Sequence, residues 1–313
     1  MAEFESIVQD YKQNLAVDPD MSMPVAAVKA LVAFIQNHPA STMVEFVEMV
    51  KAATQALKAS SANAISLSAG CDLFMQAVTR MSNANLEDCR EKLINKGTRF
   101  VEKASSCRES IAGLGVSFIR DNGVVLVHSY SRVVMALLLR AASQGKRFRV
   151  YVTESRPTRG GARTTEALRR AGVPCTEVLD CAVSYIVEQV DCVLFGAEGV
   201  VENGGIINQI GTYQVAIVAK AASKPVYAVA ESYKFVRLFP LNQFDLPTHR
   251  PSVLSFDPPS PEVLADEAQA LKWVAGNNPS VDYTPPSFIT LLFTDLGVLT
   301  PSGVSDELIK LYY

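Results

Sequence analysis

Polar and charged side chains stand together at four points of the sequence, each time directly after a short apolar run. They occupy residues 128–132, 153–157, 196–199 and 231–234. Hydroxyl, amide, carboxylate and guanidinium groups can together hold a small polar ligand through hydrogen bonds and ion pairs. If the apolar runs are parallel strands, their carboxyl ends meet at one edge of a sheet, where ligands of open α/β sheets bind. The pattern therefore predicts a small-molecule pocket; the alternative is that these residues only cap helices and solvate loop ends.

The motifs of several better-known chemistries are missing. There is no G-x-x-x-x-G-K-[ST] phosphate-binding loop and no H-E-x-x-H zinc motif. The stretch 113–118 (GLGVSF) begins like the dinucleotide motif G-x-G-x-x-G but ends in phenylalanine. With three histidines in all, His38, His128 and His249, a multi-histidine metal site is not expected, and we predict no metal and no cofactor. His128 is either an acid–base group or a hydrogen-bonded structural residue.

The elements that would position these side chains alternate between strands and helices. Short apolar runs predict strands at 124–129, 148–155, 175–180, 191–198 and 225–232. Helical stretches of about ten residues separate them, and Asp180 is expected to cap one of these helices, at 182–188. This alternation predicts a parallel sheet built from βαβ units. The strands are almost wholly apolar, which indicates that both faces of the sheet are covered.

Residues 1 to about 120 show helical spacing only. Apolar residues recur at helical positions in 25–36, and Thr42 with Glu45 fits a capping box that opens a second helix. A third helix is expected to start near Ser68 and a fourth near Asn85, with Gly97 as a candidate break. The sequence thus predicts an α/β protein with an all-helical N-terminal domain (1–120) and a mainly parallel, doubly wound C-terminal domain (121–313).

Composition excludes several classes of protein. With 49% hydrophobic and 19% charged residues, the chain is not globally disordered. A formal net charge of −3 excludes a strongly basic nucleic-acid binder, and the apolar stretches are far shorter than the ~20 residues that span a bilayer. The N-terminus is acidic and has no apolar signal region, and the six cysteines form no C-x-x-C pair. These features predict a cytoplasmic protein with reduced thiols and without direct nucleic-acid or membrane contacts.

Three long motifs resemble one known family. They are YVTESRP at 151–157, GAEGVVENGGIINQIGTYQVAIVAKAASKPVYAV at 196–229 and TPPSFITLLFTDLGVLTPSGVSDELIKLYY at 284–313. The family comprises the alpha, beta and delta subunits of translation initiation factor 2B and the isomerases that act on methylthioribose-1-phosphate and ribose-1,5-bisphosphate. The resemblance covers nearly the whole chain, though only loosely over the N-terminal helices, and its motifs are most similar to those of the alpha branch.

The resemblance implies a fold and a role. It implies a helical N-terminal domain, a Rossmann-like C-terminal domain and a homodimer. Independently, the five large apolar residues of the tail at 305–313 predict that the tail is docked or lies near the dimer interface. The resemblance further implies partnership with the beta, delta, gamma and epsilon subunits in the complex that recycles initiation factor 2 from its GDP-bound to its GTP-bound form. The chain would be a regulatory subunit that helps to sense initiation factor 2 phosphorylated on its alpha subunit and lowers initiation under stress. Candidate cations for that phosphate are Lys29, Lys51, Lys58 and Arg80.

The alternative implied by the same family is a sugar-phosphate isomerase. Those enzymes use a cysteine after the first strand and an aspartate after the fourth as an acid–base pair, and a lysine in N-K-I-G-T binds phosphate. This chain has Ser129, Glu198 and Gln209 at those positions. A serine hydroxyl is a far weaker acid than a thiol, whose pKa is about 8.5. The longer glutamate displaces the carboxylate, and a misplacement of ~1 Å can cost ~100-fold in rate.

A residual pocket for a sugar phosphate or nucleotide is nevertheless expected. Its residues would be Ser129, Tyr130, Arg132, Glu154, Arg156, Glu198, Asn208 and Gln209. Arg132 and Arg156 are the expected phosphate ligands, because guanidinium forks match phosphate oxygens. Whether the Pro- and Ser-rich segment 252–282 is ordered stays open from the sequence.

Overall fold

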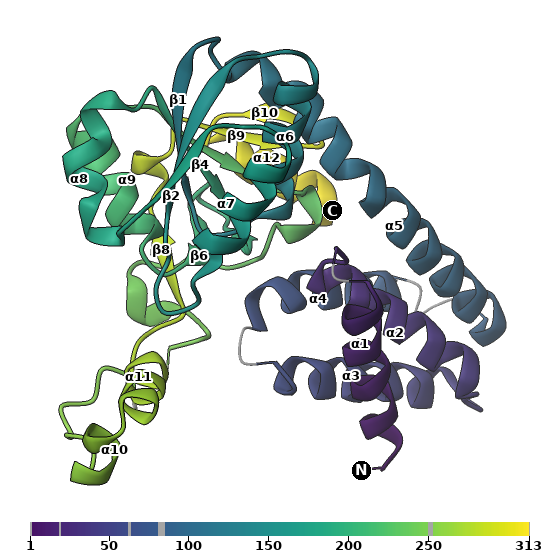
Figure 1. Cartoon of the computed structure of the whole chain (residues 1–313). Coiled ribbons are helices and arrows are strands. Elements are labelled where there is room, and N and C mark those ends of the chain that lie inside the picture. Colours follow the sequence, from purple (N-terminus) through teal and green to yellow (C-terminus); the bar gives the residue numbers. More distant parts are fainter. Residues whose placement is uncertain (1, 19, 62–63, 81–84, 250–252, 313) are drawn as a thin grey trace.

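The computed structural model describes residues 2–18, 20–61, 64–80, 85–249 and 253–312 (Figure 1). The chain begins with five helices: α1 (Ala2–Val17), α2 (Met23–Asn37), α3 (Met43–Ala59), α4 (Ala64–Arg80) and α5 (Leu86–Gly115). From residue 123 onward strands and helices alternate. The predicted class, a helical N-terminal region followed by a mainly parallel α/β sheet, is confirmed.

The main sheet has seven strands in the order β10-β9-β7-β4-β1-β2-β3. They are β1 (Gly123–His128), β2 (Phe148–Thr153), β3 (Cys175–Val178), β4 (Cys192–Gly196), β7 (Val226–Val229), β9 (Leu291–Thr294) and β10 (Gly297–Leu299). Neighbouring strands are parallel except β9 and β10. The first five correspond to the predicted strands, whereas β9 and β10 were not expected.

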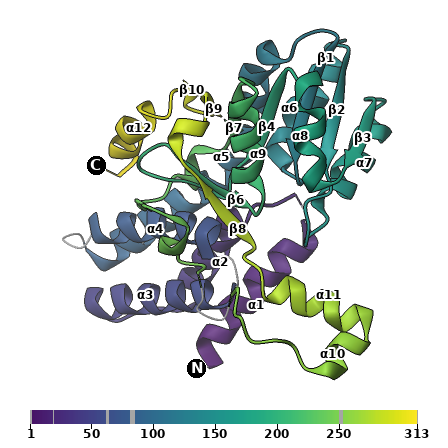
Figure 2. The same cartoon turned by 90° about the vertical axis from the view of Figure 1, so that its left-hand side faces the viewer.

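Helices cover both faces of this sheet (Figure 2). They are α6 (Arg132–Ser143), α7 (Gly160–Arg170), α8 (Val183–Ile186), α9 (Thr212–Ala221) and α12 (Gly303–Tyr312). Alternate residues of one strand point to opposite faces. Val125 and Val127 accordingly pack with the end of α5 and with α6, while Leu126 and Phe195 pack with α8, α9 and α12. This double burial explains why the central strands are apolar without alternation.

Helix α5 joins the two regions (Figure 1). Leu93 in its first half belongs to the core of the helical bundle, and Ile111 near its end packs against the sheet. The candidate break at Gly97 is wrong, because the helix is continuous there. Gly97 instead allows α2 to approach closely, since a β-carbon at this position would lie 2.3 Å from Val32 Cγ2. The predicted domain boundary at residue 120 stays a prediction.

The predicted helix starts and the predicted capping box are confirmed only in part. Thr42 is the N-cap of α3 as predicted, and its hydroxyl accepts a hydrogen bond from the Glu45 backbone N–H at 3.2 Å. The Glu45 carboxylate, however, accepts from Ser41 rather than from Thr42. Helix α5 begins after Asn85, close to the predicted start, and Asn85 is its N-cap. Helix α4 begins at Ala64, before the predicted Ser68, and α1 was not predicted.

A small antiparallel sheet, not foreseen from the sequence, lies beside the main one. It contains β5 (Gly199–Val200), β6 (Ile206–Gln209) and β8 (Val281–Thr284), and β6 is its central strand. In the segment 252–282, residue 252 lies outside the described residues. The remainder contains α10 (Pro261–Ala265) and α11 (Glu267–Gly276) before it enters β8. Both views show these two helices projecting from the body as an arm (Figures 1 and 2).

Candidate functional site

The parallel register brings the predicted tips to one edge of the sheet. His128 pairs with Thr153, and β4 lies beside β1, so these three strands end side by side. Ser129 follows β1 in the left-handed region (φ 63°) and is buried. Its carbonyl accepts a hydrogen bond from Thr164 of α7 at 2.8 Å. Gly160 at the start of α7 comes so close that a β-carbon there would lie 2.4 Å from Ser129 Oγ.

Glu198 and Gln209 form the most direct contact among the predicted site residues. Gln209 Nε2 donates to Glu198 Oε1 at 2.5 Å. Burial raises the pKa of Glu198, although the Gln209 hydrogen bond and the charge of Lys234 oppose that rise. Gln209 Oε1 is itself buried without a hydrogen-bond partner in the described structure. A ligand hydroxyl placed here could donate to that oxygen.

The Asn208 side chain points toward the connection between β6 and α9. Its side chain donates to Thr212 Oγ1 at 3.0 Å, and Thr212 Oγ1 donates to the Gln209 carbonyl at 2.6 Å. Asn208 is buried. These bonds hold the first turn of α9 next to the Glu198–Gln209 pair.

The residues after β1 face two other elements. Arg132 Nη1 donates to the Met21 carbonyl, which links the start of α6 to the connection between α1 and α2. The guanidinium of Arg163 lies 3.8 Å from the centre of the Tyr130 ring, a cation–π contact. The Arg132 guanidinium is therefore already engaged by the protein before any phosphate binds.

The residues after β2 divide between the backbone and a separate cavity. The backbone N–H of Glu154 donates to Val178 at 2.8 Å. The Arg156 side chain is exposed and lines a cavity of about 590 Å³ with Tyr213 and Asp282, which Glu198, Asn208 and Gln209 do not line. The structure thus brings Glu198, Gln209 and Asn208 together and places Arg156 in another hollow.

Asp180 does not cap a helix, contrary to the prediction. A short 3₁₀ turn begins at this residue, with Leu179 as its N-cap. The Asp180 carboxylate instead accepts hydrogen bonds from the backbone N–H groups of Ser155 and Arg156, both at 2.8 Å. These N–H groups lie just beyond β2 and have no strand partner, so a carboxylate on the neighbouring β3 connection satisfies them.

His128 is a structural residue. Its Nε2 lies 2.9 Å from the Ile210 carbonyl and its Nδ1 lies 2.7 Å from Thr153 Oγ1. Because a carbonyl can only accept, Nε2 carries the proton and Nδ1 accepts from the threonine in the neutral ring. Burial lowers the pKa of His128. Of the two alternatives from the sequence, the geometry favours the hydrogen-bonded one.

Asp282 is a buried acid that sequence reasoning missed. Its Oδ2 accepts from the backbone N–H groups of Gly211 at 2.8 Å and Tyr213 at 3.1 Å, at the start of α9. Burial raises its pKa to about 7 despite these bonds, and Oδ1 has no partner in the described structure. The only sequence signal was an acid between the β-forming residues Val281 and Tyr283, in a strand that was not predicted.

Among the described residues, no three or more His, Cys, Asp or Glu side chains are grouped to hold a metal ion. In the same part of the chain, no helix is long and apolar enough to cross a membrane. Burial raises the pKa of Cys71, Cys107 and Cys192 to about 12, so these groups are thiols rather than reactive thiolates at neutral pH.

The fold and the sequence together define the class of protein. The Initiation factor 2 subunit family matches residues 16–301, and the chain belongs to this family. It is 43% identical to translation initiation factor eIF2B subunit alpha of Dictyostelium discoideum, over 99% of this chain and 98% of the relative. It is 37% identical to the subunit of the same name from Caenorhabditis elegans, over 98% and 99%. The resemblance inferred from the motifs is confirmed.

Isomerases and solved structures complete the comparison. The ribose 1,5-bisphosphate isomerase of Archaeoglobus fulgidus is 33% identical over 72% of this chain and 69% of the relative. The crystal structure of eIF2B beta from Chaetomium thermophilum superposes with a TM-score of 0.72 at 19% identity, covering 99% of this chain and 90% of that one. A chain of the tetrameric eIF2B-beta2-delta2 complex from C. thermophilum gives a TM-score of 0.74 at 21% identity, covering 99% and 94%. At these identities the structures support the fold alone.

Proposed function

We propose that the protein is a non-catalytic regulatory subunit of eIF2B, the complex that returns initiation factor 2 from its GDP-bound to its GTP-bound form. The observation that carries this proposal is the 43% identity to an eIF2B alpha subunit over 99% of the chain. The protein acts in the cytosol with the beta, delta, gamma and epsilon subunits. It helps to sense initiation factor 2 phosphorylated on its alpha subunit, and so lowers initiation under stress.

The geometry at the strand tips supports a non-catalytic role. An isomerase needs two groups that exchange protons with adjacent carbons of the sugar. Ser129 offers a hydroxyl, which is too weak an acid for this step. The Glu198 carboxylate already accepts a hydrogen bond from Gln209. The second candidate, a ribose-1,5-bisphosphate isomerase, is supported by identity to such enzymes, for example 33% over 72% of the chain.

A direct assay separates the two candidates. The purified protein would be incubated with ribose-1,5-bisphosphate, and product would be followed by NMR. We expect no turnover. Turnover above the rate of a Glu198→Gln variant would establish the isomerase instead.

In this proposal the residues that follow the strands still bind a small molecule. A sugar phosphate or nucleotide would contact Glu198 and Gln209, with phosphate oxygens reaching Arg132 or Arg156. Thermal unfolding with these compounds at millimolar concentration tests this, since a bound ligand stabilises the fold. Gln209→Ala and Arg156→Ala then divide the site. If only Gln209→Ala abolishes the ligand-induced rise in melting temperature, the ligand binds next to Glu198 and Gln209. If the rise is unchanged in both variants, the ligand does not bind at these residues.

Exposed apolar residues support assembly. Large apolar side chains of the connection after β7 and of the arm reach solvent: Phe239, Leu241, Phe244, Leu254, Phe256, Leu264, Leu271 and Val274. Leu241 is 80% exposed and Phe256 is fully exposed. Apolar surface gathered in this way is typical of protein interfaces. A second copy of the chain would cover part of it in a homodimer.

The helical half is the proposed reader of phosphorylated initiation factor 2. A phosphoserine carries about −1.5 to −2 charges at pH 7 and pairs best with an exposed cation. Of the candidate cations, Lys51 pairs with Glu48 at 2.9 Å and Lys58 pairs with Asp72 at 2.7 Å. Lys29 on α2 is exposed, so we favour it as the first position to test.

The decisive experiment measures GDP release from initiation factor 2. The exchange factor would be reconstituted with and without this chain and assayed on phosphorylated and unphosphorylated substrate. We expect basal exchange to be largely unchanged without the chain, while inhibition by the phosphorylated form is blunted. Equal inhibition in both preparations would refute the regulatory role.

A further inference from the structure

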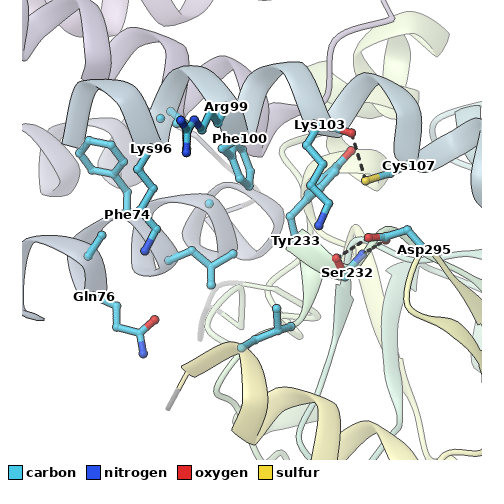
Figure 3. A pocket seen from close by; sticks show the side chains of 17 residues that line it. Phe74, Gln76, Lys96, Arg99, Phe100, Lys103, Cys107, Ser232, Tyr233 and Asp295 are labelled. Carbon is cyan, nitrogen blue, oxygen red and sulfur yellow. Dashed lines mark hydrogen bonds between the residues drawn. The ribbon is translucent and has the colours of Figure 1, made fainter. Parts of the chain in front are cut away.

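A second cavity lies between the helical region and the edge of the main sheet. Ser232 and Tyr233 line it, whereas Glu198, Asn208 and Gln209 do not. Its volume is about 340 Å³. Helices α4 and α5 form one side, and the segment after β7, the turn after β9 and helix α12 form the other (Figure 3). The apolar part of its wall consists mainly of Leu73, Phe74, Phe100 and Leu311. This size and lining are typical of small-molecule pockets.

The charged groups of this cavity are mostly positive. Lys96, Arg99 and Lys103 line it from α5, at the three- and four-residue spacing that keeps side chains near one face. In Figure 3, Lys96 and Lys103 extend from the helix to the same side as the Phe100 ring. Burial lowers the pKa of Lys96, so its ammonium group would gain from a nearby anion.

The acid of the cavity is already engaged. Asp295 is the sole carboxylate among the lining residues. Its Oδ1 accepts from the Ser232 backbone N–H at 2.7 Å and its Oδ2 accepts from Ser232 Oγ at 2.8 Å. The lining therefore has an excess of positive charge beside a broad apolar surface.

Covalent chemistry is not expected here. Cys107 also lines the cavity, but burial raises its pKa to about 12, and its thiol donates to the Lys103 carbonyl at 3.4 Å. The thiol therefore stays protonated and is a poor nucleophile.

We propose that this cavity binds an amphipathic monoanion, namely an aliphatic or aromatic carboxylate of medium size. Its apolar part lies against Phe74, Phe100 and Leu311, and its carboxylate faces Lys96 and Lys103. A sugar phosphate does not fit this chemistry, because its hydroxyls would face apolar walls without partners. The ligand would contact both the helical half and the C-terminal helix, and would therefore stabilise their contact.

Titration calorimetry of the full chain tests the ligand class. Hexanoate, octanoate and decanoate would be compared with 1-octanol and octylammonium. We expect octanoate to bind more tightly than hexanoate, because apolar contact grows with chain length. The uncharged and cationic compounds should bind at least about tenfold more weakly than octanoate, since they lack the charge that the lysines recognise. Equal affinity for octanoate and 1-octanol, or no binding at millimolar octanoate, would overturn the proposal.

Variants locate the binding. Lys96→Gln combined with Lys103→Gln removes both charges but keeps polar side chains, and should weaken octanoate binding about tenfold. Lys92→Gln, one turn before Lys96 and outside the cavity lining, is the matched control and should bind octanoate like the parent. Unchanged affinity in the double variant would overturn the proposal.

Two further measurements separate this site from others. Ala77 lines the cavity and is buried, so Ala77→Met should fill part of it and abolish binding. The melting temperature of each variant would be measured first, and the glutamine variants provide the answer if the methionine variant does not fold. Displacement of octanoate by ribose-1,5-bisphosphate would assign the anion to the strand-tip residues and overturn the inference.

Discussion

Gly97 of α5 faces Val32 of α2 with no space for a β-carbon between them. A β-carbon at position 97 would lie 2.3 Å from Val32 Cγ2. Gly113, further along the same helix, is exposed, and a β-carbon there would meet only the Arg140 side chain at 3.5 Å. The two glycines have the same helical backbone but opposite packing, which makes them a matched pair.

Replacing each glycine by alanine should therefore have opposite effects. Gly97→Ala should lower the free energy of unfolding by ~1–3 kcal/mol, because the valine side chain is stiff and cannot easily move aside. Gly113→Ala should raise it by ~0.5–1 kcal/mol, because alanine loses less backbone entropy in a helix. Urea unfolding followed by circular dichroism measures both. Equal stabilisation by the two substitutions would show that α2 and α5 are not closely packed at Gly97.

Glu231 joins α5 to the segment after β7 and should support stability at neutral pH. It is buried, with Arg108 Nε at 3.3 Å and Lys234 Nζ at 2.9 Å. Burial alone would raise the pKa of Glu231, but the two cations outweigh it and hold the pKa at about 2. Glu231→Gln leaves both cations without their anion, and should lower the free energy of unfolding by about 3 kcal/mol at pH 7.

The pH dependence gives a second readout for Glu231. In the unfolded chain a glutamate titrates near ~4.3, so the stability from this group is present above that pH and lost as the pH falls toward about 2. The unfolding midpoint of Glu231→Gln should thus fall less steeply over this window than that of the parent. Glu166→Gln, which breaks an exposed pair with Arg170, is the control and should change stability by less than ~0.5 kcal/mol. Parallel pH curves for parent and Glu231→Gln would contradict the assignment.

Asp282 should produce the opposite pH dependence. Its pKa is raised by burial to about 7, so the folded protein binds the proton more tightly than the unfolded chain, in which aspartate titrates near ~3.9. The stability from this proton is complete below that value and is lost as the pH rises through about 7. Asp282→Asn should remove this loss, on the order of 3 kcal/mol between pH 4 and pH 8, because the amide stays neutral.

Guanidinium unfolding across that pH range measures the Asp282 effect. The asparagine oxygen can still accept from the N–H groups of Gly211 and Tyr213, so the start of α9 should be kept. Asp257→Asn, at an exposed aspartate in the connection that precedes the arm, is the matched control and should follow the parent curve. If the stability of Asp282→Asn depends on pH as that of the parent does, Asp282 is ionised across the whole pH range. The hydrogen bonds to its carboxylate would then offset the cost of burying the charge.

The exposed apolar residues of the connection between β7 and the arm should be needed for self-association. Static light scattering on the parent at micromolar concentration should give twice the chain mass of 33.9 kDa. Leu241→Glu combined with Phe256→Glu should shift this to the monomer mass, because two charges cannot be buried in an apolar interface. Tyr185→Glu on α8, an equally exposed position, should stay dimeric. A monomeric parent would refute the homodimer.

Assignment of the elements from sequence succeeded where local periodicity is strong. The strands before Ser129, Glu154 and Glu198 were placed to within a few residues, because apolar, β-branched runs of five or six residues between turn residues have few alternatives. The Thr42 cap was also correct, since an N-cap is a contact within one helical turn. The short strands β5, β6, β8, β9 and β10 were missed. Runs of two to four residues carry almost no periodic signal.

The candidate site was predictable in outline and not in detail. Parallel topology was sufficient to expect that Ser129 and Glu198 lie at the same edge of the sheet. It could not show that Arg132 donates to the Met21 carbonyl, more than one hundred residues away along the chain. Nor could it show that Arg156 lines a different cavity from Gln209.

Sequence alone was sufficient to predict the class of fold, the edge of the sheet where polar groups gather and, through the long motifs, the family. Each of these follows from residues that are near one another in the chain. The folded structure was needed to show that α5 continues through Gly97, that Asp180 supports the end of β2, and that Asp282 is a buried acid beneath α9. Close packing and the pairing of buried polar groups depend on which distant segments of the chain come into contact. Local sequence propensity does not specify those contacts.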